Sequence, residues 1–309
     1  MICRPSCKTV FVMLLSLALV ACQTSPPAAR PPAKPSADET ATAPALAPKP
    51  LRPPRIGLAL GGGAARGFAH IGVIQVLEEA GIHPDLVVGT SAGSLVATLY
   101  ASGKAGPELA RLALAMDESA LTDWSFPGRG LIRGEALAHY VREHTAGRQI
   151  EQMSLPLGIV ATDLDSGAPI LFPRGDAGVA VRASSAVPAL FQPVRIGSRE
   201  YVDGGLVSPV PVRFARQMGA ELVIAVDISS TPEGNATGDA MRMLLQTFAI
   251  MSRSINRFEL KEADVVLRPL LNGVSSADFA SRKHSIDAGR AAALALLPQL
   301  RQRIAALTR

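Results

Sequence analysis

"LVVGTSAGSLVA", residues Leu86 to Ala97, places a short apolar run directly before Gly-Thr-Ser-Ala-Gly and a helical pattern directly after it. A sharp strand-to-helix turn of this kind presents a serine hydroxyl as a nucleophile. Gly89 and Gly93 remove side chains where such a turn is crowded, and Ser91 would lie at the N-terminus of a helix, whose dipole favours negative charge. The same residues also fit a serine that caps the helix of an ordinary βα turn. A serine needs a base to become a nucleophile, so the rest of the chain must decide.

Strands and helices alternate on both sides of this turn. A strand at "RIGLAL" is followed by a glycine-rich loop and by "ARGFAHIGVIQVLEEAGI", whose apolar residues recur at helical spacing. Buried-strand patterns return at "LPLGIVATDL" and "ELVIAVDIS", with helical patterns between and after them. This alternation predicts an α/β fold in which a mainly parallel sheet is covered by helices on both faces.

The glycine-rich loop is "GGGAARG", Gly61 to Gly67. Consecutive glycines between a strand and a helix direct backbone N–H groups into a cavity, which suits a phosphate or the oxyanion of an acyl-transfer intermediate. A P-loop needs Gly-Lys-Ser/Thr, which is absent, and Arg66 stands where the dinucleotide motif needs its third glycine. The oxyanion interpretation is therefore favoured. Arg66 either anchors the loop and adds positive potential or forms a surface salt bridge.

Two residues are candidates for the base. In "YVDGGLVSPVP", Asp203 precedes Gly204 and Gly205, a pattern that in isolation is also typical of a simple turn. His284 would complete the chain order serine, aspartate, histidine of a Ser-His-Asp esterase. However, its segment "SRKHSID" looks like a charged loop just before the last helix, and one histidine in a suitable order is weak evidence.

Four stretches together indicate a family. "GLALGGGAARGFAHIGVIQVLEEAGI", "GTSAGS", "ATDLDSG" and "VDGGLVSPVPV" follow one another between Ile56 and Asp227 in the order and spacing of the bacterial patatin-like phospholipases, which the chain resembles. The resemblance implies a three-layer α/β/α sandwich with a mainly parallel central sheet. It also implies hydrolysis of phospholipid or lysophospholipid acyl esters, with lipid as the substrate and no metal or organic cofactor.

The resemblance also implies a dyad without histidine, in which Ser91 is the nucleophile and Asp203 its direct base. The oxyanion hole would lie in the glycine loop, on the backbone amides of Gly62 and Gly63, with Gly61 and Arg66 beside them. The sequence departs from the family at Ser208, where members often have asparagine, and its glycine motif is one residue longer than the common one.

Two further alternatives stay open. An envelope lipoprotein with an inactive hydrolase scaffold would bind or dock without catalysis, although the intact motif residues speak against it. The methionine-rich "MRMLLQTFAIM" and the lone Trp124 either line a lipid channel or lid or belong to the core. Methionine at helical spacing favours the core.

The N-terminal segment predicts export. Arg4 and Lys8 precede "TVFVMLLSLALVA", an apolar run too short to span a bilayer and typical of a signal peptide. It ends in "LVAC", which resembles the lipobox of bacterial lipoproteins, where cleavage leaves Cys22 to be acylated with palmitate or a similar chain. An ordinary signal peptide would instead release a soluble periplasmic esterase. All three cysteines lie in this segment, so no disulfide or cysteine-ligated metal is expected in the folded domain.

These patterns divide the chain into a signal peptide (1–21), a lipid-anchored linker rich in proline and alanine (22–54) and a hydrolase domain (55–309). The linker composition cannot build a core. Without the signal peptide, 29 basic side chains face 26 acidic ones, an excess too weak to indicate nucleic acid. Gln23 resembles the residue that follows the cysteine in lipoproteins sorted to the outer membrane. The expected location is therefore the bacterial envelope, lipid-anchored and facing the periplasm.

Overall fold

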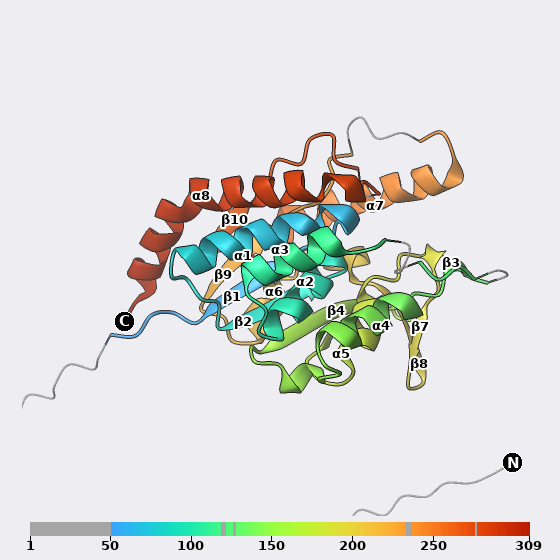
Figure 1. Ribbon diagram of the computed structural model, residues 1–309, viewed down its shortest axis with the longest axis horizontal. Coiled ribbons are helices and arrows are strands. Elements are labelled where there is room, and N and C mark those ends of the chain that lie inside the picture. Colours follow the sequence, from blue (N-terminus) through green and yellow to red (C-terminus); the bar gives the residue numbers. More distant parts are fainter. Residues whose placement is uncertain (1–50, 119–121, 126–127, 233–236, 276) are drawn as a thin grey trace, which may run out of the picture. The chain divides into compact units, whose positions relative to one another are not determined.

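A computed structural model describes residues 51–118, 122–125, 128–232, 237–275 and 277–309. The predicted signal peptide and most of the predicted linker lie outside these residues. Figure 1 shows the arrangement of the elements. The strands are β1 (Ile56–Leu60), β2 (Leu86–Thr90), β3 (Gly130–Ile132), β4 (Leu157–Asp163), β5 (Pro169–Phe172), β6 (Ala189–Phe191), β7 (Val194–Ile196), β8 (Arg199–Asp203), β9 (Leu222–Val226) and β10 (Val265–Leu267). The α-helices are α1 (Ala69–Glu79), α2 (Ala92–Ala101), α3 (Gly106–Ala115), α4 (Glu135–His144), α5 (Ala177–Ser184), α6 (Val212–Gln217), α7 (Ala240–Glu259) and α8 (Arg282–Leu307).

The main sheet has the strand order β10-β9-β1-β2-β4-β8-β7. The first five of these strands are parallel, whereas β8, β7 and β5 are antiparallel to their partners. Side chains of β1 alternate between two cores: Leu58 packs with residues of α1, α2 and α8, and Ala59 packs with residues of α6 on the opposite face. The predicted three-layer α/β/α sandwich with a mainly parallel sheet is confirmed.

Strand β4 has three partners, and this arrangement positions the site. Strand β5 pairs with residues 159–162 of β4. Some of these residues also pair with β2 and others with β8, so β5 must lie on the opposite side of β4 from both of these strands. On the other side, β2 pairs with residues 157–160 in the parallel sense and β8 with residues 161–163 in the antiparallel sense. The carboxyl ends of β2 and β8 therefore point at each other.

The described residues also form short 3-10 helices, among them η1 (Ala64–Phe68), η4 (Gly204–Leu206) and η5 (Leu260–Glu262). Helix α8 begins at Arg282, so the prediction of a charged loop at "SRKHSID" is wrong: all but the first residue of this stretch belong to the helix.

The two ends of the folded unit are joined by backbone hydrogen bonds. The amide of Arg52 donates to the carbonyl of Arg309 at 2.9 Å, and the amide of Arg309 donates to the carbonyl of Arg52 at 3.1 Å.

The core interpretation of the methionine-rich helix and of Trp124 is wrong for several residues. Trp124 is 71% exposed, and Met243 and Ile250 of α7 are each more than half exposed. Helical spacing identifies residues that share a face but does not show what covers that face. None of the helices in the described part of the chain is long and apolar enough to cross a membrane.

Helices α1 and α8 approach each other closely through reciprocal glycines. A Cβ atom at Gly72 of α1 would lie 1.9 Å from the carbonyl oxygen of Ile286, and one at Gly289 of α8 would lie 1.9 Å from the carbonyl oxygen of Ala69. Both obstacles are helix backbone, which cannot move aside as a flexible side chain can. The helix pair therefore depends on both glycines.

Replacing Gly72 or Gly289 by alanine is expected to lower the free energy of unfolding by about 3 kcal/mol or more, because the methyl group forces the helices apart. Urea denaturation of the purified variants measures the change. Gly238→Ala is the matched control, since a Cβ there meets nothing within 4 Å. Unfolding midpoints of all three variants equal to that of the unmodified protein would contradict this account of the α1–α8 contact.

Candidate active site

Ser91 sits in a sharp turn between β2 and α2. Its backbone has φ +52° and ψ −125°, a conformation that is strained for any residue with a side chain. A Cβ atom at Gly89 would lie 2.4 Å from the carbonyl oxygen of Gly93, and one at Gly93 would lie 2.2 Å from that of Leu60. The turn therefore requires both glycines. The Ser91 side chain makes no capping hydrogen bond, so the helix-cap alternative is wrong.

The hydroxyl of Ser91 is bonded directly to Asp203. Ser91 Oγ donates to Asp203 Oδ2 at 2.7 Å, and the amide of Gly205 donates to Asp203 Oδ1 at 2.7 Å. Asp203 is the last residue of β8 and is only 4% exposed. Burial raises the pKa of Asp203 to about 6, although both hydrogen bonds act in the opposite direction. The carboxylate is thus a stronger base than an aspartate in water and is still ionised at neutral pH.

Two hydroxyl side chains that sequence reasoning missed hold this pair. Ser184, at the end of α5, accepts a hydrogen bond from the amide of Ser91 at 2.8 Å and donates to the carbonyl of Val160 at 2.5 Å. Thr162 donates to the backbone carbonyl of Asp203 at 2.8 Å. Both lie far from Ser91 in the chain; Ser184 belongs to no motif, and Thr162 lies in "ATDLDSG" without having been singled out as a site residue. Only the fold brings them to the site.

The glycines after Asp203 are also needed for close packing. A Cβ atom at Gly204 would lie 2.3 Å from the carbonyl oxygen of Val160, and one at Gly205 would lie 2.9 Å from Asp203 Oδ1. The Asp-Gly-Gly sequence therefore does more than form a turn: it lets η4 lie against β4 and turns a backbone amide toward the carboxylate.

The glycine loop after β1 runs alongside Ser91. A Cβ atom at Gly62 would lie 3.1 Å from Cβ of Ser91. The amide of Gly62, however, donates to the carbonyl of Pro209 at 2.9 Å, and the amide of Gly61 donates to the last carbonyl of β9 at 3.0 Å. Contrary to the prediction, neither amide is free for an oxyanion in this arrangement. Within the described residues no acceptor is bound to the amide of Gly63, which leaves it as the available donor of the three.

Arg66, in η1, and His70, in α1, are both buried next to this loop. Arg66 is buried, so the surface salt-bridge alternative is wrong, and its Nε has no hydrogen-bond partner in the described part of the chain. Burial lowers the pKa of Arg66 to about 10, with the charge of Asp227 opposing the shift. His70 Nε2 donates to the carbonyl of Gly61 at 2.8 Å. Burial lowers the pKa of His70 to about 4, so the neutral ring positions the loop at pH 7.

His284 is not part of this arrangement. Its side chain is exposed in the first turn of α8, and no hydrogen bond among the described residues joins it to Ser91 or Asp203. The direct contact between the serine and the aspartate leaves no place for an imidazole between them. The described residues also hold no group of three or more His, Cys, Asp or Glu side chains arranged for a metal ion.

Ser208, where the family often has asparagine, connects the site to α7. Its hydroxyl donates to Glu259 Oε1 of α7 at 2.6 Å, while its backbone carbonyl accepts from Thr90 Oγ1 at 2.9 Å. Thr90 directly precedes the nucleophile. Burial raises the pKa of Glu259. The C-terminal half of α7 is therefore tied to the turn that carries Ser91.

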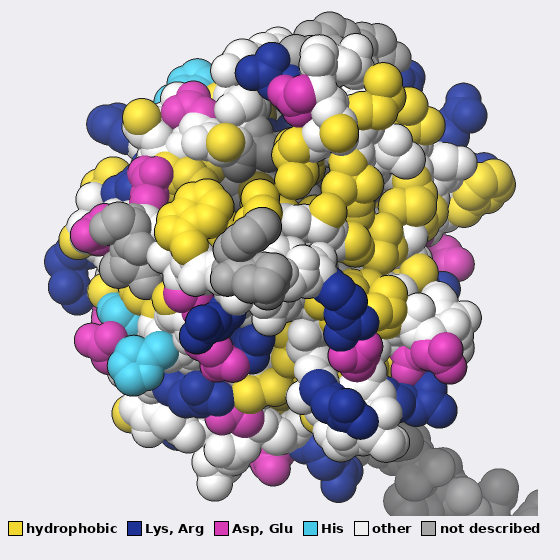
Figure 2. Space-filling model, turned by 90° about the vertical axis from the view of Figure 1, so that its right-hand side faces the viewer, with side chains coloured by type: hydrophobic (Ala, Val, Ile, Leu, Met, Phe, Trp, Pro, Cys, Tyr) yellow, Lys and Arg dark blue, Asp and Glu magenta, His cyan; other side chains and the backbone are white. Residues whose placement is uncertain are grey.

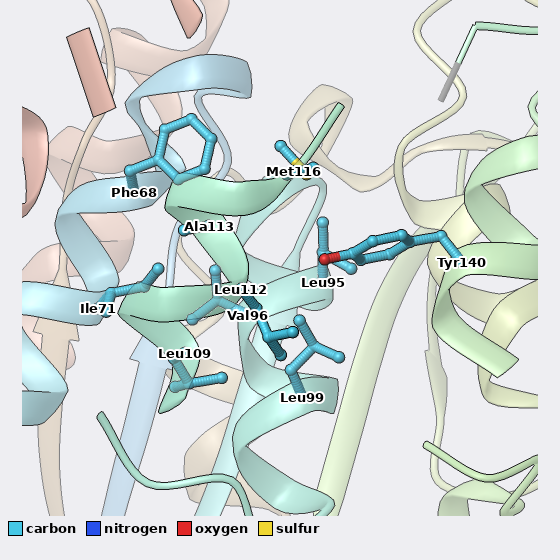
Figure 3. Close-up of a pocket in the computed structure, with 10 residues that line it drawn as sticks. All are labelled: Phe68, Ile71, Leu95, Val96, Leu99, Leu109, Leu112, Ala113, Met116 and Tyr140. Carbon is cyan, nitrogen blue, oxygen red and sulfur yellow. The ribbon is translucent and has the colours of Figure 1, made fainter. Parts of the chain in front are cut away.

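A small apolar cavity lies beside α2, the helix that begins after Ser91 (Figure 3). Its volume is about 30 Å³, room for about two water-sized groups, so it does not accommodate a fatty-acid chain as it stands. Residues from η1, α1, α2, α3 and α4 line it, among them Leu95, one helical turn after the serine. The lining residues are Phe68, Ile71, Leu95, Val96, Leu99, Leu109, Leu112, Ala113, Met116 and Tyr140.

Comparison with curated proteins finds both bacterial and mammalian relatives. An uncharacterized NTE family protein of Mycobacterium tuberculosis is 36% identical over 215 residues, which cover 66% of this chain and 59% of that protein. Patatin-like phospholipase domain-containing protein 6 of Mus musculus is 34% identical over 196 residues, 60% of this chain and 14% of that protein. The chain thus spans 59% of the length of this mycobacterial relative and a much smaller part of the mouse protein.

Among solved structures, VipD from Legionella pneumophila has a similar fold, with a TM-score of 0.56 over 81% of this chain and 68% of that chain, at 16% identity. The family model described as patatin-like phospholipase matches residues 58–216, just over half of the chain. The matched segment includes the last three residues of β1, the glycine loop, the Ser91 turn and the Asp-Gly-Gly sequence. The chain belongs to the patatin-like phospholipase family.

Proposed function

We propose that this protein hydrolyses acyl esters of phospholipids or lysophospholipids, with Ser91 as nucleophile and Asp203 as base. The observation that carries the proposal is the 2.7 Å hydrogen bond from the hydroxyl of Ser91, in its strained turn, to the buried carboxylate of Asp203. Membership of the patatin-like phospholipase family supports the choice of a lipid ester as substrate.

In the first step Ser91 Oγ attacks the ester carbonyl while its proton moves to Asp203 Oδ2, the atom that already accepts its hydrogen bond. The carbonyl oxygen becomes an oxyanion. The free amide of Gly63 and the helix N-terminus that follows Ser91 provide the positive potential that stabilises it. The protonated Asp203 then transfers its proton to the leaving alcohol, and the acyl group remains on Ser91.

In the second step a water molecule takes the position of the alcohol. Asp203 accepts a proton from this water, the hydroxide attacks the acyl carbonyl, and Asp203 returns the proton to Ser91 Oγ as the fatty acid leaves. A pKa of about 6 suits both roles, because the group is ionised before each attack and is acidic enough to return the proton afterwards. No imidazole is needed in either step.

Replacing Ser91 by alanine is expected to abolish esterase activity and labelling by a fluorophosphonate probe, because both require the hydroxyl nucleophile. Asp203→Asn removes the base and is expected to lower kcat by about a thousandfold or more. His284→Ala is the matched control and should leave kcat within about twofold. Hydrolysis of a soluble ester by each folded variant measures these effects.

Full activity of Ser91→Ala would contradict the nucleophile assignment. A large loss in His284→Ala would favour the Ser-His-Asp alternative. An unmodified protein that neither hydrolyses any ester of a lipid panel nor reacts with the probe would favour the inactive scaffold.

We also propose that the protein is a lipoprotein of the bacterial envelope, held by acylated Cys22 at the outer membrane. The lipobox-like "LVAC" and Gln23 support this location, and the part of the predicted linker before Leu51 would serve as a tether, whose proline-rich composition favours an extended chain. Metabolic labelling with a palmitate analogue should label the unmodified protein and not Cys22→Ser. Equal labelling of both would contradict the anchor.

A further inference from the structure

Helix α7 leaves several of its large apolar residues exposed. Of its 20 residues, Ala249, Asn256 and Glu259 are buried, and two of these three are polar. Ile250 is 54% exposed and Phe258 is 70% exposed. The helix packs on η4 and η5, and one side of it remains open. An amphipathic helix normally buries its apolar stripe, so this exposure needs an explanation.

The same helix carries basic side chains on its surface. Arg242, Arg253, Arg257 and Lys261, just beyond its end, are exposed. The acidic side chains beside them offset part of this charge: Asp239 pairs with Arg242, and Glu262 is exposed next to Lys261, whereas Glu259 is buried against Ser208. A helix that combines exposed Met, Ile and Phe with arginine and lysine has the composition of helices that lie in the interface of a bilayer.

Trp124 and Leu131 extend the apolar surface. Trp124 is 71% exposed and forms a bridge with Ile132 of β3, and Leu131 of the same strand is exposed as well. Figure 1 shows β3 and the N-terminal half of α7 at the same end of the molecule. Figure 2 views that end and shows a broad band of hydrophobic side chains with charged side chains of both signs around it. Tryptophan is enriched at membrane interfaces because its ring is large, apolar and able to donate one hydrogen bond.

This surface adjoins the site on both sides. On one side Ser208 bonds to Glu259 of α7. On the other side, the amide of Asp203 donates to the carbonyl of Ala186 at 3.0 Å. Ala186 lies three residues before β6, and β6 pairs with β3, the strand that contains Leu131. Strands β1, β2, β4 and β9 also direct their carboxyl ends, where Ser91 lies, toward the end of the molecule seen in Figure 2.

We propose that α7 together with Trp124 and Leu131, here called the docking face, binds the surface of an anionic phospholipid bilayer. The apolar side chains enter the boundary between head groups and acyl chains, and the arginines and Lys261 bind lipid phosphates. The inference rests on the proposed function, because a lipid hydrolase gains access to its substrate by docking its site on the bilayer. It is independent of the anchor at Cys22, which holds the chain near a membrane without orienting the domain.

The sole tryptophan of the chain makes docking measurable, because Trp124 alone dominates the emission. The full-length protein with Ser91→Ala, which leaves the lipid intact, is mixed with vesicles of phosphatidylcholine alone or with one third phosphatidylglycerol. Anionic vesicles are expected to shift the emission to shorter wavelength, and lipids brominated near the head group should quench it. The N-terminal segment is the same in every sample and contains no tryptophan, so quenching reports contact of the lipid with Trp124.

Paired variants separate the docking face from the rest of the surface. Ile250→Ser is compared with Leu294→Ser, on α8, since the two side chains are 54% and 52% exposed. The double variant Arg257→Glu/Lys261→Glu is compared with the double variant Arg301→Glu/Arg303→Glu, whose residues lie on α8. The α7 variants are expected to weaken vesicle affinity at low salt by about fivefold for Ile250→Ser and at least tenfold for the double charge reversal. The α8 variants should stay within twofold.

A second measurement distinguishes failure of docking from failure of the proposed activity. With Ser91 restored, each α7 variant should lower the ratio of vesicle-lipid hydrolysis to soluble-ester hydrolysis by fivefold or more. Absence of Trp124 quenching by anionic vesicles, or equal effects of the α7 and α8 variants, would overturn the proposal even if the protein is an active esterase. A concentration-dependent dimer that the α7 variants dissociate, with no vesicle binding, would overturn it in favour of a second copy of this chain.

Discussion

The site depends on one feature of the sheet: β2 and β8 share a single side of β4 and approach each other from opposite directions. Parallel strands alone would bring Ser91 to the edge of the sheet among loops. The antiparallel β8 instead ends at Asp203, one position along β4 from where β2 ends at Thr90. The 2.7 Å contact between Ser91 and Asp203 follows from this register, and glycines at both strand ends provide the space.

Burial makes this contact chemically useful, and it does so at a cost in stability. An ionised carboxylate loses water in the interior, and the two hydrogen bonds that Asp203 accepts replace only part of that solvation. The same environment raises its affinity for a proton, which a base for a serine hydroxyl requires. Ser91 contributes a second cost through its strained backbone, which Ser184 holds in place.

Local patterns predicted the parallel strands β1, β2, β4 and β9, the Ser91 turn and the Asp-Gly-Gly sequence, because each of these is set by residues next to one another in the chain, whereas the antiparallel strand β8 was not predicted. Features that depend on a distant partner were missed or mistaken. The amide of Gly62 is occupied by Pro209, well over a hundred residues later, and Ser184 and His70 act through contacts that no motif records. The spacing of apolar residues in α7 indicated a helix, whereas the exposure of Ile250 depends on what packs against it.

The most direct measurement of the dyad is the pH dependence of kcat/KM for a soluble ester, in the unmodified protein and in His284→Ala. With Asp203 as the base, kcat/KM is expected to fall as the pH decreases through a single ionisation near pH 6, where Asp203 becomes protonated, and His284→Ala should leave this profile unchanged. An ionisation that disappears when His284 is replaced would show that an imidazole is the base, and would contradict the dyad.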